Sequence, residues 1–310
     1  MGFRFVDVTG SLLKRHVNVR SICYHLPEVK RSKARRGITM RKFLVFLLLS
    51  VLALGQLNGI ASAAGLTLKG STTVLPIAQA AMEAYVALYP NTKFSISGEG
   101  SGNGIKALID GTCDIANSSR FIKQEEAKLA FEKGAYPVPF GVAIDAIVPI
   151  VHPKNTVNNL TLQQLKDIYS GKITNWKEVG GPDKKIAVIT RDTSSGTFEI
   201  WEEKIMKGEK ITPRAQVLAS NGAIVQAVSM NPLAIGYIGI GYLNNSVKGV
   251  SVEKVKATPE TARTGEYPIS RYLFMFTRGW PTGETMRFIN FILSDEGQKI
   301  VTKTGFVPIR

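Results

Sequence analysis

The sequence predicts an α/β fold with mixed, mostly parallel sheets and flanking helices, divided into two lobes. Strand-like and helix-like segments alternate along most of the 310 residues, as in folds whose parallel strands are joined by helices. The strands are too many for one small sheet, and the length suits two domains of ordinary size. One long apolar stretch, residues 138–151, is interrupted only by Asp145 and is typical of a buried strand that crosses between the lobes.

Composition and charge exclude several classes of protein. Apolar residues make up 44% of the chain, which excludes disorder throughout, and two cysteines exclude a disulfide scaffold. The net charge of +15 invites a nucleic-acid partner. Residues 1–39, however, carry nine Lys and Arg against two Asp and Glu, so much of the surplus lies ahead of the predicted lobes. Since no basic stripe with interleaved aromatic residues follows, we expect no nucleic-acid partner.

Residues 40–63 have the order of a secretory signal peptide. Met40-Arg41-Lys42 is a short basic start, 43–54 is an apolar core, and Ala61-Ser62-Ala63 is a cleavage sequence. We expect export with cleavage after Ala63; the alternative is an uncleaved signal anchor. Because 39 basic, patternless residues precede this segment, we expect 1–39 to be an extension of the gene model and Met40 to be the initiator. The alternative is a long genuine basic region.

The chain beyond residue 64 begins with alternating strands and helices. Residues 66–69 alternate apolar and polar side chains, which predicts a short strand, and 75–89 has helical spacing that ends at Pro90. The same criteria predict strands over 94–97 and from 115, and helices over 105–110 and 124–133.

The alternation continues to the C-terminus. Thr161 stands where the N-cap of a helix is expected, and residues 169–171 end that helix. The remaining predictions are strands over 186–189, 235–240 and 271–277 and helices over 198–206, 223–229, 282–293 and 295–301.

Three loops share the order strand, then glycine with serine or threonine, then helix. They are Gly70-Ser71-Thr72-Thr73, Gly100-Ser101-Gly102 and Ser194-Ser195-Gly196-Thr197. A helix N-terminus exposes unpaired N–H groups, glycine lets an anion approach the backbone, and hydroxyls add donors. Because such loops meet at the carboxyl edge of a parallel sheet, together with Arg191 they predict a small-oxyanion site. Each loop alone is explained by helix capping, and Arg191 alone by a surface salt bridge.

The motifs of nucleotide-binding, serine-hydrolase and metal-binding sites are absent from the sequence. Residues 98–106 match neither the Walker A nor the dinucleotide spacing, and no G-x-S-x-G elbow surrounds Ser71, Ser101 or Ser195. No Cys/His cluster or EF-hand spacing occurs, so we expect no metal and no cofactor. Beyond residue 63 the chain keeps one cysteine, Cys113, expected to be a small buried hydrophobe, and one histidine, His152. A secreted phosphatase or hydrolase that uses Ser195 stays an alternative.

Several segments, in order, resemble the phosphate-binding components of phosphate ABC transporters, which are type II periplasmic binding proteins. They are GSTTVLP, GEGSGNGIKALIDGTCDIANSSR, RDTSSGTFE, NPLAIGYIGIGY, FINFILSDEGQKIV and GFVPI. The resemblance implies a two-lobed fold with two hinge crossovers, one lobe from 64–144 plus 258–310 and the other from 145–257. It also implies a periplasmic, monomeric, non-enzymatic protein that captures inorganic phosphate in the cleft for a membrane permease. Molybdate, tungstate or sulfate as ligand, or a sensor or adhesin without a transporter, remain alternatives.

The resemblance also assigns site residues. The first loop contributes the Thr72 hydroxyl and the Thr73 N–H, with Ser71 adjacent, and the second contributes Ser101. The third contributes the guanidinium of Arg191 and the hydroxyl and N–H groups of Ser195, Gly196 and Thr197.

One position departs from the family pattern. Well-known members carry an aspartate that accepts the proton of bound phosphate, where this sequence has Ser119, followed by Arg120. Asp145 is a candidate substitute, with a hinge or cap carboxylate as the alternative. Arg120 is a candidate donor, with a salt bridge to a neighbouring helix as the alternative.

Overall fold

The structure, a computed structural model, describes residues 65–310, so the predicted signal peptide and the extension before it lie outside the described residues. Within this part of the chain no helix is long and apolar enough to cross a membrane. Nine strands form one sheet in the order β2-β1-β3-β11-β4-β8-β6-β7, with β9 paired to β4. Their bounds are β1 Leu66–Gly70, β2 Phe94–Gly98, β3 Ile115–Ser118, β4 Pro137–Val151, β6 Ala187–Arg191, β7 Gln216–Leu218, β8 Ala234–Gly239, β9 Lys248–Gly249 and β11 Ser270–Arg278.

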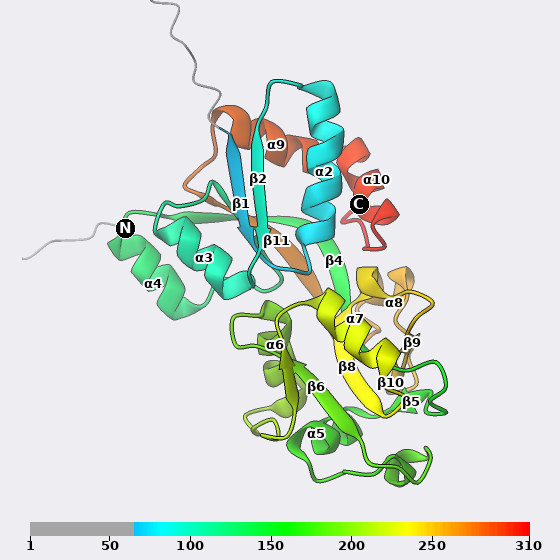
Figure 1. Cartoon of the computed structure of the whole chain (residues 1–310). Helices are drawn as coiled ribbons and strands as arrows, with labels where there is room; N and C mark the ends of the chain where they lie inside the picture. Colours follow the sequence, from blue (N-terminus) through cyan, green and yellow to red (C-terminus); the bar gives the residue numbers. More distant parts are fainter. Residues whose placement is uncertain (1–64) are drawn as a thin grey trace, which may run out of the picture. The chain divides into compact units, whose positions relative to one another are not determined.

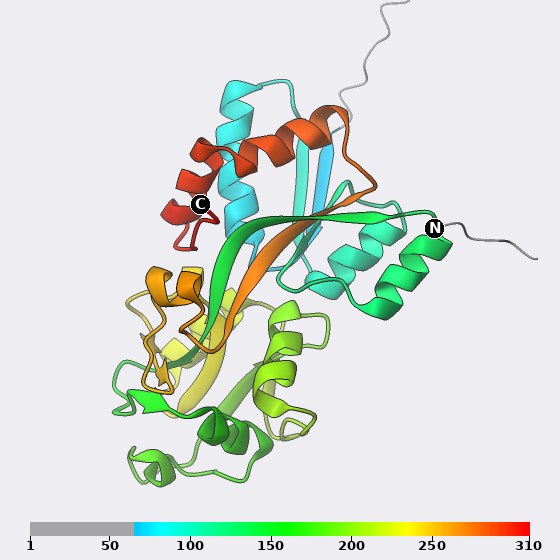
Figure 2. The same ribbon diagram turned by 180° about the vertical axis from the view of Figure 1, so that it is seen from behind.

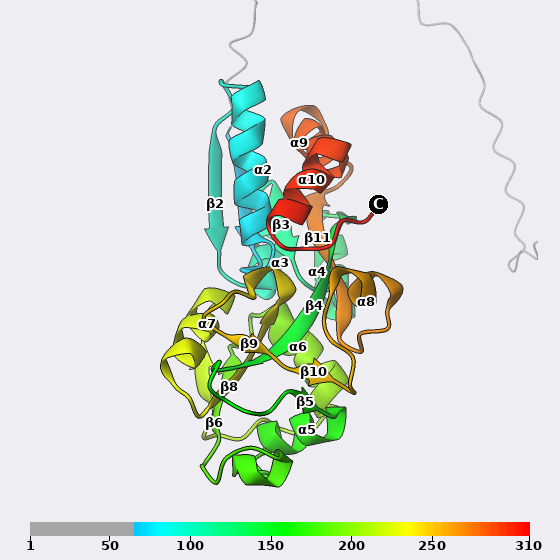
Figure 3. The ribbon, with the colours of Figure 1, turned by 90° about the vertical axis from the view of Figure 1, so that its right-hand side faces the viewer.

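The remaining elements lie around this sheet, as Figure 1 shows. A separate parallel pair joins β5 to β10. The bounds are β5 Asn159–Leu160, β10 Ser251–Val252, α2 Leu75–Leu88, α3 Ser101–Ile109, α4 Gln124–Glu132, α5 Leu162–Ser170, α6 Gly196–Trp201, α7 Asn221–Met230, α8 Pro259–Thr264, α9 Gly283–Leu293 and α10 Asp295–Lys303. Helix α2 packs against α9 and α10 (Figure 3), and α3 packs against β1, β3 and α4.

Strand β4 belongs to both halves of the sheet. Residues 137–146 pair antiparallel with β11 across a bulge that leaves Val142 without a partner, and residues 147–151 pair antiparallel with β8. On its other side β11 is antiparallel to β3. The outer pairings are parallel: β1 with β2 and β3, and β6 with β7 and β8. Figure 2 shows β4 and β11 running together from one half into the other. The predicted mixed α/β class and the crossing strand at 138–151 are confirmed, while the lobe boundaries at 144/145 and 257/258 stay a prediction.

An aromatic cluster holds the second half together beneath the predicted site. Trp201 stacks on Tyr237 with ring centroids 4.2 Å apart, and Tyr169 lies 4.9 Å from Trp201. The three rings come from α6, β8 and α5, and all are buried. The Tyr237 hydroxyl accepts the backbone N–H of Arg191 at 3.3 Å and lies 2.8 Å from the Thr190 hydroxyl. The core therefore fixes the backbone at the start of the third loop.

Some element bounds differ from the predictions for local reasons. Helix α3 begins at Ser101 rather than 105, so half of the glycine-rich segment is already helical. The helix predicted over 198–206 is α6 followed by a single π-helical turn at Glu202–Met206. The N-cap at Thr161 is confirmed, since its side chain accepts the Gln164 N–H. Strands β5, β7, β9 and β10 and helix α8 are too short to give a periodic signal.

Gly104 provides a test of how closely α3 packs against β1. A Cβ added at Gly104 would lie 2.6 Å from the Gly70 Cα and 2.7 Å from the Lys69 carbonyl oxygen. We expect Gly104→Ala to lower the free energy of unfolding by about 1–3 kcal/mol, because backbone atoms cannot move aside cheaply. Urea unfolding followed by tryptophan fluorescence measures the change.

Gly222→Ala is the matched control for this substitution. Gly222 lies in α7, and its added Cβ would meet only the Ser220 hydroxyl, at 3.9 Å. Because alanine favours a helix over glycine, we expect an unchanged stability or a gain of up to ~1 kcal/mol. Equal effects of the two substitutions would contradict the packing argument.

Candidate anion-binding site

The three predicted loops come together in one buried cluster. The hydroxyls of Thr73 and Thr197 lie 3.1 Å apart, although the residues are 124 positions apart in sequence. The hydroxyls of Ser101 and Ser119 lie 3.2 Å apart, and the Ser119 N–H donates to the Ser101 hydroxyl at 3.0 Å. All four residues are buried. The structure thus joins the loops after β1, β3 and β6 and the start of α3.

Gly196 is the point at which these loops approach most closely. A Cβ added there would lie 2.5 Å from the Ser101 hydroxyl and 2.8 Å from the Ser119 hydroxyl. The backbone N–H of Gly102 also donates to the Ser194 carbonyl at 3.0 Å, which links the second loop to the third. A glycine is therefore required at position 196 for the serine hydroxyls to reach this backbone.

The hydroxyls of Ser71 and Ser195 accept backbone N–H groups near the starts of α2 and α6, and only Ser195 is the N-cap of its helix. The Ser71 hydroxyl accepts the N–H groups of Thr73 at 3.1 Å and Val74 at 3.3 Å. The Ser195 hydroxyl accepts the Phe198 N–H at 3.3 Å at the start of α6. The capping alternative thus describes Ser195, whereas Ser71 stabilises the turn that precedes α2. The role of both residues as phosphate ligands stays a prediction.

Arg191 is held by backbone carbonyls rather than by a salt bridge at the surface. Its side chain is buried; Nε donates to the Leu218 carbonyl at 3.1 Å and Nη2 to the Ala219 carbonyl at 2.8 Å. Its nearest carboxylate oxygen, on Asp192, is 3.8 Å away. Among the described residues Nη1 has no hydrogen-bond partner. Burial lowers the pKa of this guanidinium, as does the positive charge of Arg271.

Asp145 forms a buried ion pair that sequence reasoning missed. Asp145 on β4 is directly opposite Arg271 on β11, and its Oδ2 accepts Nε at 2.9 Å and Nη2 at 2.7 Å. Its Oδ1 accepts the Ile240 N–H at 2.9 Å. Burial raises the pKa of Asp145, and Arg271 opposes that rise. The same Nη2 donates to the Thr197 hydroxyl at 3.0 Å, which connects the ion pair to the loop cluster.

Asn221 is a second residue that the sequence analysis did not select. Its Nδ2 donates to the hydroxyls of Thr72 and Thr73 at 3.1 Å each, and its Oδ1 accepts the Gly239 N–H at 3.1 Å. It begins α7 after the capping residue Ser220. The signal was available, because Asn221-Gly222 before a predicted helix resembles the other loops. For Arg271 the signal was a lone charge at the start of an apolar strand.

Arg120 lies in an ion-pair network. Its Nη atoms donate to both Glu126 oxygens at 2.8 and 2.7 Å, and its Nε lies 2.6 Å from Oε2 of Glu199. Lys123 lies 2.8 Å from the same Glu199 oxygen. The salt-bridge alternative therefore describes Arg120 in this structure, whereas Ser119 beside it belongs to the hydroxyl cluster. A role for Arg120 as ligand donor stays a prediction.

The cysteine and histidine that a nucleophilic mechanism would need do not belong to the hydroxyl cluster. Cys113 is buried, and burial raises the pKa of its thiol to about 12, so it is protonated at neutral pH. The His152 ring accepts the Lys154 N–H at 3.0 Å in a turn after β4. Within residues 65–310 no group of three His, Cys, Asp or Glu side chains could hold a metal ion.

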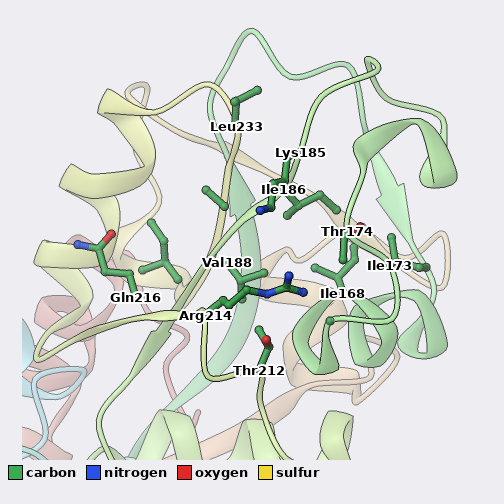
Figure 4. Close-up of a pocket in the computed structure, with 13 residues that line it drawn as sticks. Ile168, Ile173, Thr174, Lys185, Ile186, Val188, Thr212, Arg214, Gln216 and Leu233 are labelled. Carbon is green, nitrogen blue, oxygen red and sulfur yellow. The ribbon is translucent and has the colours of Figure 1, made fainter.

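A cavity of about 440 Å³ lies between α5 and β6 and contains none of the predicted anion-binding residues. Isoleucines and Val188 form much of its wall, with Lys185 and Arg214 among them (Figure 4). Both basic residues are exposed, so their charges are solvated. The cavity offers an apolar surface rather than a dehydrated anion site.

Glu199 provides a test of the ion-pair network. It links α6 to Arg120 and Lys123 between β3 and α4, and the Arg120 side chain is only 4% exposed. We expect Glu199→Gln to lower the free energy of unfolding by about 1–3 kcal/mol, because a buried guanidinium loses part of its compensation. Thermal or urea unfolding measures this change in the free energy of unfolding.

Glu203→Gln, at an exposed glutamate of the next turn, is the control. A loss no larger than the control's would contradict the network's importance.

Comparison with known proteins identifies the family to which this chain belongs. A family model described as "PBP superfamily domain" matches residues 58–296. The phosphate-binding protein PstS of Borreliella burgdorferi is 38% identical over 253 residues, 78% of this chain and 88% of that protein. PstS of Bacillus subtilis is 32% identical and covers 79% and 80% of the two chains.

Solved structures agree with these relatives. A phosphate ABC transporter substrate-binding protein of Clostridium perfringens, solved with bound phosphate, is 38% identical with a TM-score of 0.75, over 79% of this chain and all of that one. An ABC-type phosphate transport receptor of Vibrio cholerae is 35% identical with a TM-score of 0.65, over 78% and 99%. The predicted type II periplasmic binding protein fold is thereby confirmed. This chain belongs to the PBP superfamily and, within it, to the PstS family of phosphate-binding proteins.

Proposed function

We propose that this protein binds inorganic phosphate within the loop cluster and delivers it to the permease of an ABC transporter. The observation that carries the proposal is the buried guanidinium of Arg191, whose Nη1 has no partner among the described residues, beside the threonine and serine hydroxyls of the joined loops. The family supports phosphate as the anion, since the C. perfringens relative was solved with phosphate bound.

The chemistry of such a site is capture rather than reaction. A dehydrated phosphate must recover its lost hydration from hydrogen bonds, and a buried cation offsets part of its charge. Neutral donors from Thr72, Thr73, Ser101 and Thr197, with Arg191, meet both needs. The Ser195 hydroxyl accepts the Phe198 N–H, and among the described residues it makes no hydrogen bond to a His, Asp, Glu or Lys side chain that could act as its base. We therefore favour a transporter component over the hydrolase alternative.

Phosphate titration tests the proposal. We expect the purified protein to bind phosphate calorimetrically and to keep binding it in the presence of excess sulfate or molybdate. If sulfate or molybdate displaces phosphate, the competing oxyanion is the ligand, and the fold assignment is unaffected. Absence of binding to all three anions would overturn the proposed function.

Arg191→Gln tests the residue on which the proposal depends. Because charge-assisted hydrogen bonds to a buried anion are the strong ones, we expect phosphate affinity to fall by roughly 100-fold. Arg214→Gln, at an exposed arginine of the same half of the sheet, is the control and should leave affinity unchanged. Undiminished binding by Arg191→Gln would place the anion elsewhere.

We also propose that the protein is exported and that it works with permease subunits as a monomer. The basic start at 40–42, the apolar core at 43–54 and the Ala61-Ser62-Ala63 sequence support export. N-terminal sequencing of the exported protein should begin at Ala64. A peptide from residues 1–39 in the precursor would contradict initiation at Met40.

A further inference from the structure

Arg271 has the same unusual environment as Arg191. Its Nε and Nη2 pair with Oδ2 of Asp145, and Nη2 also donates to the Thr197 hydroxyl. Its Nη1 is buried and, among residues 65–310, has no hydrogen-bond partner. Exposure of the Arg271 side chain is 4%. A guanidinium donor this deeply buried is costly to leave unpaired, so its surroundings point to an acceptor outside the protein chain.

The two guanidiniums lie at one cluster. Arg271 contacts Thr197, whose hydroxyl contacts that of Thr73, and Arg191 begins the same loop that ends at Thr197. Burial lowers the pKa of Arg191, and the charge of Arg271 lowers it further. Each contributes an Nη1 that has no hydrogen-bond partner within residues 65–310.

The nearest carboxylates compensate the charges of Arg191 and Arg271 unequally. Asp145 compensates Arg271, while Asp192 stays 3.8 Å from Arg191. Arg191 is thus the less completely compensated of the two buried guanidiniums, and a bound anion would add to its compensation. Two cations around one site also favour a doubly charged ligand over a singly charged one.

Asp145 itself is closed off from a ligand by its neighbours. Oδ2 accepts two N–H groups of Arg271, and Oδ1 accepts the Ile240 N–H. A Cβ added at Gly239 would lie 2.9 and 3.1 Å from the two carboxylate oxygens, so the backbone of Gly239 covers them. This carboxylate holds Arg271 in place, and Arg271 is the group with a free donor.

We propose, resting on the phosphate-binding function above, that Arg271 is a second anion-binding guanidinium and that with Arg191 it makes the site select doubly charged tetrahedral oxyanions. Arg271 lies outside the three loops, on β11, the strand that runs beside β4 between the halves of the sheet. Anion binding would then involve the crossing strands directly as well as the loops.

Phosphate titration over pH tests this proposal. Between about pH 5 and pH 8 phosphate loses its second proton and becomes a dianion. We expect wild-type affinity to rise over this range. Arg271→Gln should lower affinity by roughly 100-fold at the upper end and much less at the lower end, so that the rise flattens. A purely structural role of Arg271 would lower affinity by the same factor at every pH.

Two further variants separate binding from folding. Arg271→Gln leaves the Asp145 carboxylate buried without its partner, which can prevent folding. The double variant Asp145→Asn and Arg271→Gln removes both charges and should fold, yet still bind phosphate weakly with a flattened pH dependence. Arg271→Lys keeps the charge but not the planar fork, and should keep the rise with pH at lower affinity. Circular dichroism and thermal unfolding verify the fold of each variant.

Arg278→Gln is the matched control, because Arg278 is an exposed arginine at the far end of the same strand. It should leave both affinity and pH dependence unchanged. The inference about Arg271 is wrong, while the proposed function stands, if the wild type binds phosphate, Arg191→Gln lowers its affinity, and the folded Arg271 variants keep wild-type affinity and pH dependence. If the wild type does not bind phosphate, the proposed function itself is wrong.

Discussion

A buried ion pair on the shared strand is the constraint on which the rest of the structure depends. Asp145 lies on β4 directly opposite Arg271, and two residues later β4 changes its partner from β11 to β8. Because an unpaired buried charge costs several kcal/mol, the pair strongly favours one register of β4 against β11. That register brings Arg271 to the hydroxyl of Thr197, which belongs to the other half of the sheet. The ion pair thus sets the register of β4 against β11 and, through Arg271, contacts the hydroxyl cluster.

Close approach of the loops follows from the residue types at their tips. Hydroxyls from Ser101 and Ser119 can come near the backbone of Gly196 only because position 196 has no Cβ. Gly100, with φ of 100°, turns the chain into α3 in a conformation that other residues rarely adopt. Threonines with short, branched side chains then fill the remaining space with donors. The glycine, serine and threonine composition of the loops is therefore a packing requirement as well as a source of hydrogen bonds.

A feature of the fold or site could be predicted from the sequence where a local sequence pattern encodes it. The alternation of strands and helices, the crossing strand over 138–151 and the cap at Thr161 are local patterns, and the structure contains all three. The edge rule for parallel sheets places Thr73 and Thr197 after the carboxyl ends of β1 and β6. These two strands belong to different halves of the sheet, so the 3.1 Å contact between the two hydroxyls depends on the pairings through β11, β4 and β8 as well. The partner of Asp145 could not be derived in this way, because Arg271 is 126 residues away and only strand pairing brings the two together. Arg120 shows the same limit, since Glu199 reaches it from a distant helix.

The serine at position 119 changes how the proposed site would recognise phosphate. A carboxylate at that position accepts a proton from the ligand, whereas the Ser119 hydroxyl can either donate or accept and so imposes no protonation state. The Asp145 carboxylate does not restore the requirement, because Arg271, Ile240 and the backbone of Gly239 surround it. Under the proposed function, discrimination would rest mainly on charge, supplied by two buried guanidiniums. Selection by charge separates dianions from monoanions well, but it separates phosphate from sulfate only through the hydrogen bonds of the hydroxyl cluster, so the geometry of those hydroxyls must set the preference between the two.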